Sequence, residues 1–180
     1  MSLDIATLFT VTVFATGLGG LLLLFAWLQA RNTLELAWWG LAFVVLTPAV
    51  ALFGLRGVVP EIWSVKAAGT MMMLAYGLMW TGARVFEGRR SLPMWAVAGA
   101  LVWFIACQIE PFMQSVTARV VLASCIVGSY SAAFVRELWL CRKDGLVSRW
   151  PVMALVALHA LLFPFRAPTI ATLPFPLSAP

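Results

Sequence analysis

The sequence predicts an all-α, polytopic helical membrane bundle, and three observations lead to this prediction. Of the 180 residues 63% are hydrophobic and 11% are charged, which is more apolar surface than a soluble domain of this length can bury. The apolar residues run in blocks of about twenty, the length of a helix that crosses a bilayer. They do not alternate with polar residues as the strands of a membrane barrel do. We therefore expect one membrane domain over residues 1–163.

Six apolar blocks are long enough to be considered as membrane spans. They are predicted at residues Ile5–Leu28, Leu34–Leu55, Ile62–Ala83, Pro93–Ile109, Thr117–Leu138 and Leu146–Phe163. The connections between them are short, so consecutive helices should be antiparallel neighbours in one bundle. The first block is not a signal peptide, because the opening MSLDIATL has Asp4 where a basic region belongs. The first span should therefore stay in the protein.

Orientation follows from the lysines and arginines on alternate loops, since cytoplasmic loops carry the excess. One side would hold eight of them: Arg31, Arg84, Arg89, Arg90, Arg136, Arg142, Lys143 and Arg149. The other side would hold four: Arg56, Lys66, Arg119 and Arg166. We expect the first set in the cytoplasm and the N-terminus outside. Topology and anionic lipid account for the net charge of +5, which requires no nucleic-acid partner.

The last residues of the sequence are rich in proline. Residues 164–180, PFRAPTIATLPFPLSAP, contain five prolines and cannot continue a helix. With an even number of spans before it, this segment should be an extracytoplasmic loop. We expect it to lead to a seventh span after residue 180.

Residues that support catalysis or metal binding are few. His159 is the single histidine, so one chain cannot form an HExxH motif or a two-histidine haem site. The three cysteines show no CxxC or Cys/His ligand spacing. The GLGG run at 17–20 lies in an apolar block and lacks the context of a phosphate loop. We predict no catalytic residue, no metal site and no cofactor in this chain.

Polar residues gather near the external ends of the predicted spans and form a candidate ligand-binding cluster. Its members are Glu61, Lys66, Gln108, Glu110, Gln114, Arg119 and His159. His159 is included because thirteen residues from Leu146, at about 1.5 Å each, place it about 20 Å from the cytoplasmic side. Charged groups at such depth are costly unless they are paired or hydrated. We predict a shallow external pocket for a small polar or anionic molecule; alternatively, the cations snorkel outward and His159 is a packed, hydrogen-bonded residue.

A second candidate region lies on the third span. Tyr76, Trp80, Arg84 and Glu87 recur at helical spacing and should share one face that ends at the cytoplasmic boundary. One interpretation is a face that transmits motion along the helix. The other is an interfacial aromatic belt in which Arg84 stacks on Trp80.

Small residues at four-residue spacing predict close helix packing on the first and fifth spans. They are Thr12 and Thr16 on the first, and Ser124, Gly128 and Ala132 on the fifth. Such faces let helix backbones approach closely. The expected partners of the chain are therefore the lipid bilayer and a second copy of itself.

Several stretches resemble a known family. LAWWG at 36–40, RGVVP at 56–60, YGLMWTGARVFEGRR at 76–90 and the WLQARN that ends the first span are similar to the membrane-embedded N-terminal regions of alphaproteobacterial GGDEF proteins, the diguanylate cyclases. The resemblance implies a bacterial inner-membrane protein with a cytoplasmic catalytic domain that condenses two GTP, with Mg²⁺, into cyclic di-GMP. The GG[DE]EF motif itself is not in these 180 residues, so no catalytic residue is carried over.

Three functions compete at this point. The first is a sensory or anchoring input region that regulates a cyclase and receives an unknown extracytoplasmic molecule. The second is a small inner-membrane transporter, for which paired, broken spans with a polar midplane would be expected. The third is a structural or assembly subunit, which needs only packing faces and aromatic belts.

The orientation is testable with fusion reporters. Alkaline phosphatase fused after Pro180 should be active, and green fluorescent protein fused after Arg90 should fluoresce, because the basic loops are expected in the cytoplasm. Enzyme activity and whole-cell fluorescence measure the two outcomes. An inactive phosphatase fusion together with a non-fluorescent protein fusion would show the opposite orientation.

Overall fold

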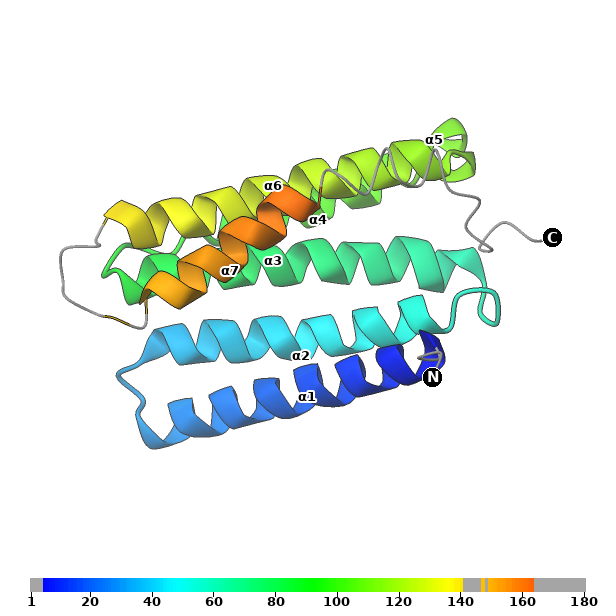
Figure 1. The fold of residues 1–180 in the computed structure, drawn as a ribbon. Coiled ribbons are helices and arrows are strands. Elements are labelled where there is room, and N and C mark those ends of the chain that lie inside the picture. The colour runs from blue at the N-terminus through cyan, green and yellow to red at the C-terminus, as the bar shows by residue number, and fades with distance from the viewer. Residues whose placement is uncertain (1–4, 141–146, 148, 164–180) are drawn as a thin grey trace. The chain divides into compact units, whose positions relative to one another are not determined.

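The computed structural model describes residues 5–140, 147 and 149–163, and the regular elements in this part of the chain are helices (Figure 1). In chain order they are α1 (Ile5–Gln29), α2 (Leu34–Gly54), the π-helical η1 (Ile62–Ala67), α3 (Ala68–Phe86), α4 (Pro93–Ala106), α5 (Glu110–Gln114), α6 (Val116–Leu140) and α7 (Arg149–Leu162). The chain divides into two compact units, with the boundary between Ile105 and Ala106. The predicted loop at 164–180 lies outside the described residues.

The all-α prediction is confirmed, whereas six membrane spans are not. Within the described residues, three helices are long and apolar enough to cross a membrane: Thr7–Gln29, Leu34–Gly54 and Val116–Leu140. The helices at the predicted fourth and sixth spans have 14 residues each, which gives a length of about 21 Å. That is shorter than the hydrocarbon core of about 30 Å. α5 was not predicted, because a single helical turn has no periodic pattern to detect.

In the first unit, α1 and α2 form an antiparallel pair that approaches closely at glycines. A Cβ on Gly20 would lie 3.0 Å from the Cβ of Phe43, and one on Gly40 would lie 2.8 Å from the side chain of Leu24. Thr47 donates a hydrogen bond across the pair from its Oγ1 to the Oγ1 of Thr16, at 3.2 Å. The side chain of Phe14, on α1, is 73% exposed. The outward face of this pair therefore suits contact with lipid.

α3 is the most enclosed helix of the first unit, and three of its glycines lie where neighbouring helices touch it. A Cβ on Gly69 would collide with the indole of Trp103, and a Cβ on Gly77 with the backbone carbonyl of Ala96. A Cβ on Gly82 would collide with the indole of Trp39 from the opposite neighbour, α2. Close packing of this kind is typical of helix pairs in membranes. These glycines place α3 between α2 and α4.

In the second unit, α6 and α7 lie side by side in opposite directions (Figure 1). Ser124 on α6 donates from its Oγ to the backbone oxygen of Phe163, at 3.2 Å. At the other end, Nη1 of Arg149 donates to the backbone oxygen of Leu138, at 2.9 Å. Both bonds end on carbonyls at the C-terminal end of a helix, where intrahelical donors are missing. They hold the pair in one register.

The glycine contacts on α3 generate a test of packing. Gly77→Ala should destabilise the fold by about 1–3 kcal/mol, because its methyl group would meet backbone rather than a side chain that can move. Gly19→Ala is the matched control, since a Cβ there meets nothing within 4 Å. Unfolding in mixed SDS micelles, followed by circular dichroism, measures both. Equal stability of the two variants would contradict the close approach of α4 to α3.

Candidate functional site

The first-unit members of the predicted polar cluster flank an unusual helix start. Glu61 precedes η1 and is exposed, and Lys66 is half-buried in its last turn. Thr70 donates from its Oγ1 to the backbone oxygen of Lys66, at 2.7 Å, where η1 joins α3. Short π-helical segments are rare and are often found at functional sites. The sequence pattern did not predict this one, because hydrophobic periodicity cannot separate one π turn from an α-helix.

In the second unit, three of the predicted residues lie around α5. Gln108 is exposed in the turn before it, and Glu110 and Gln114 are exposed at its two ends. The next residue, Ser115, caps α6: its Oγ accepts a hydrogen bond from the backbone N–H of Ala118, at 3.2 Å. Three polar side chains are thus presented on one short, exposed helical turn and its approach.

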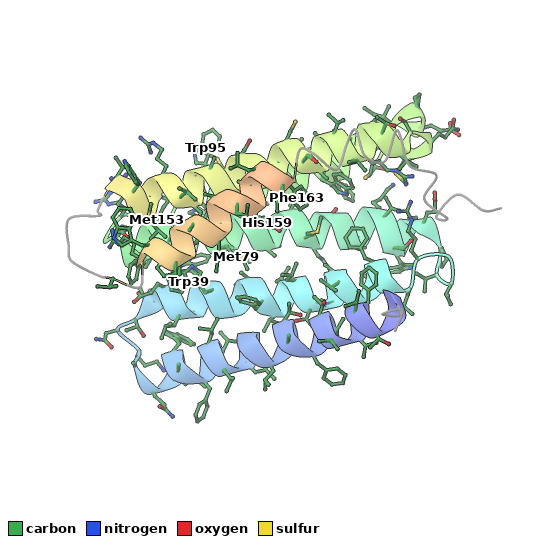
Figure 2. The ribbon with its side chains drawn as sticks, in the orientation of Figure 1. Trp39, Met79, Trp95, Met153, His159 and Phe163 are labelled. Atoms are coloured by element: carbon green, nitrogen blue, oxygen red, sulfur yellow. The ribbon has the colours of Figure 1, made fainter. Side chains whose placement is uncertain are left out.

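The two remaining members of the cluster lie deeper in the second unit. Arg119 is in the first turn of α6 and is only 7% exposed. His159 is in the last turn of α7 and packs against Phe163, with their ring centroids 5.1 Å apart (Figure 2). The hydrogen bond between Ser124 and Phe163 places this end of α7 about 7.5 Å along α6 from Arg119. His159 therefore packs against an aromatic ring at this end of α7, and its place in an external pocket stays a prediction.

The seven residues divide between the two units. Glu61 and Lys66 belong to the first, and Gln108, Glu110, Gln114, Arg119 and His159 belong to the second. One external pocket shared by all seven stays a prediction. Among the described residues, no three His, Cys, Asp or Glu side chains gather as a metal site requires.

The predicted face of the third span lies on α3 and its end. Tyr76, Trp80 and Arg84 follow one another at four-residue spacing and are half-buried, and Glu87 is the C-cap. The guanidinium carbon of Arg84 lies 5.4 Å from the ring centroid of Trp80, within the range of a cation–π contact. This is the contact that the interfacial interpretation predicted. A role in transmitting motion stays a prediction.

Trp39 on α2 is a residue whose importance was not evident from the sequence. Its indole Nε1–H donates to the backbone oxygen of Met79 on α3, at 3.1 Å, and Figure 2 shows the two residues facing each other across the helix pair. The same indole covers Gly82 and lies 5.8 Å from the ring of Phe86. The WWG run contained this residue, but only the packed helices show which tryptophan reaches α3.

Comparisons with protein-family models, with curated proteins and with solved structures found no match to this chain.

The hydrogen bond between Trp39 and Met79 generates a test of this contact. Trp39→Phe keeps an aromatic ring but removes the N–H donor, so stability should fall by about 1 kcal/mol. Trp63→Phe is the control, because Trp63 is 56% exposed and its replacement should change stability by less than about 0.5 kcal/mol. The SDS unfolding midpoint by circular dichroism gives both values. A Trp39→Phe variant as stable as the control would argue against the bond.

Proposed function

We propose that this chain is the membrane-embedded input region of a bacterial inner-membrane diguanylate cyclase, with its N-terminus outside the cytoplasm. The family resemblance described above suggests the cyclase. The observation that carries the proposal is α3, one helix that joins a charged, π-helical start to an arginine-rich end and is held by neighbours on two sides. The cyclase activity belongs to a domain beyond this chain, to which GTP and Mg²⁺ would bind.

α3 is not among the three helices that are by themselves long and apolar enough to cross a membrane, but η1 and α3 together have a length that suits a link between two membrane surfaces. Eighteen residues separate Lys66 from Arg84, which at 1.5 Å each corresponds to about 27 Å. That is close to the thickness of the hydrocarbon core, about 30 Å. A molecule bound near Lys66 would act on one end of a rod whose other end lies near the cytoplasmic surface.

Packing on both sides favours discrete movements of this rod. Glycine contacts that exclude even a methyl group leave little room for gradual sliding of α3 between α2 and α4. Tightly packed interfaces change between distinct arrangements instead. A bound molecule shifts such an equilibrium only through unequal affinity for the two arrangements. The proposed input near Glu61 and Lys66 would bind one arrangement of η1 and α3 more tightly.

A second copy of the chain is part of this proposal, because the resemblance implies that two catalytic domains face each other. Gly128 on α6 would accept a Cβ with nothing within 4 Å. An open glycine position on an apolar helix suits close contact with another helix. We propose this face of α6 as a dimer seam.

The position of the helix irregularity favours an input region over a transporter. Discontinuous helices of transporters lie near the bilayer midplane, where they bind substrate. η1 instead lies at the start of a helix, next to the loop at residues 55–61. A structural subunit would not require charged residues at the two ends of α3, so this alternative leaves them unexplained.

The proposal is tested first in the gene. The codons after Pro180 should encode a further apolar span and then a domain with a GGDEF motif. A stop codon at this point, or an unrelated domain, would overturn the cyclase proposal while leaving the membrane fold unchanged.

In cells that carry the full-length parent, the two ends of the chain should have separable effects. Glu61→Gln should change the response to an external stimulus, because it removes a charge from the proposed input at the start of η1. Arg84→Ala should shift unstimulated cyclic di-GMP, since it removes the contact with Trp80 at the proposed output end. Cyclic di-GMP, measured by mass spectrometry with and without the stimulus, gives both effects. Asn32→Ala is the control, because Asn32 is an exposed, uncharged residue in a loop. If all variants are equally abundant in the membrane and give equal cyclic di-GMP, the sensing role is contradicted.

A further inference from the structure

We propose that the arginine-rich end of the first unit is a binding site for the phosphate headgroup of an anionic phospholipid. The site consists of Arg31 in the α1–α2 loop and of Arg84, Arg89 and Arg90 around the α3–α4 loop. The inference rests on the membrane location in the proposed function and is independent of the cyclase.

Helix direction brings the two loops to one end of the unit. Gly20 on α1 approaches Val44 on α2, and Gly54 at the end of α2 approaches Phe9 near the start of α1. Trp39, early in α2, contacts Met79 and Gly82, late in α3. α4 runs back along α3 in the same way, because Gly77 meets Ala96 and Gly69 meets Trp103. The end of α1 and the end of α3 therefore share one side of the unit.

Two of the arginines are held over tryptophan rings. The guanidinium carbon of Arg31 lies 4.6 Å from the ring centroid of Trp27, and that of Arg84 lies 5.4 Å from the ring centroid of Trp80. Tryptophan is enriched at the level of lipid headgroups. A guanidinium stacked on such a ring is held at the depth where phosphates lie.

The α3–α4 loop fixes three arginines within one tight turn. The backbone N–H of Arg89 donates to the oxygen of Arg84, and that of Gly88 to the oxygen of Val85, each at 2.9 Å. This is the Schellman arrangement, with Gly88 in the left-handed conformation at φ +68°. Nε of Arg84 also donates to the oxygen of Arg90, at 3.3 Å. Backbone and side-chain hydrogen bonds within the turn thus define the position of the arginines.

Charge and surroundings at this turn match a phospholipid better than a free anion. Residues 84–90 contain three arginines and one acid, Glu87. Arginine presents a planar fork of donors that binds phosphate oxygens in pairs. Beside the turn, Phe86, Met94 and Trp95 are 40%, 75% and 56% exposed. A ligand with both a phosphate and acyl chains would use both surfaces.

The test measures lipid binding to the purified chain by native mass spectrometry, with phosphatidylglycerol and with phosphatidylcholine as probes. Phosphatidylglycerol should bind more tightly. Arg89→Gln/Arg90→Gln should weaken phosphatidylglycerol binding about 25-fold, because each arginine near the membrane surface contributes about 1 kcal/mol to the binding free energy. Arg56→Gln/Arg136→Gln removes the same charge from positions outside the site and should change the affinity little. Both variants are first checked for an unchanged SDS unfolding midpoint.

A conservative variant separates geometry from charge. Arg84→Lys keeps the charge but loses the planar fork, so phosphatidylglycerol affinity should still fall several-fold. The proposal would be overturned if the two double variants lost affinity equally, if both lipids bound alike, or if inorganic phosphate displaced the lipid. The isolated chain is used throughout, so failure of the cyclase proposal would leave these results unaffected.

Discussion

The close approach of α2 and α4 to the glycines of α3 is the contact on which the first unit depends. Burial of apolar surface cannot hold helices together in lipid, because the lipid chains are equally apolar. Association depends instead on packing and on interhelical hydrogen bonds. Gly69, Gly77 and Gly82 provide the packing, and the bond from Trp39 to Met79 adds a polar contact on the same helix. The arginine-rich turn lies at the end of the helix that this packing holds.

The second unit uses polar contacts to the backbone for the same purpose. The bonds from Ser124 to Phe163 and from Arg149 to Leu138 each end on a carbonyl at the C-terminal end of a helix. The two bonded positions are 14 residues apart on α6, at Ser124 and Leu138, and 14 apart at the other partner, at Arg149 and Phe163. Both bonds therefore fit the same antiparallel register. A short helix such as α7 is thereby attached to a much longer one. Unsatisfied carbonyls in an apolar medium are costly, which makes such bonds effective.

The candidate site was predictable only in part. Four-residue spacing correctly placed Tyr76, Trp80 and Arg84 on one helix, because helical geometry alone determines which positions share a face. The π-helical turn at Lys66 was not predictable, because hydrophobic periodicity does not separate it from an α-helix. The contact of Trp39 with α3 was not predictable, because it depends on how two helices pack. The 7% exposure of Arg119, in the first turn of α6, also depends on the residues packed around it and could not be read from the sequence.

The sequence by itself determined the helical class and the approximate position of each long helix, because apolar block length and the polar breaks between blocks are local properties. Only the tertiary structure decided that the helices described within the fourth and sixth blocks have 14 residues each and that α3 is the enclosed helix of its unit. Composition does not distinguish Gly82, which lies under the indole of Trp39, from Gly19, where a Cβ would meet nothing within 4 Å. That difference arises when another helix arrives at the glycine, and the arriving residue can be forty or more positions away in the chain.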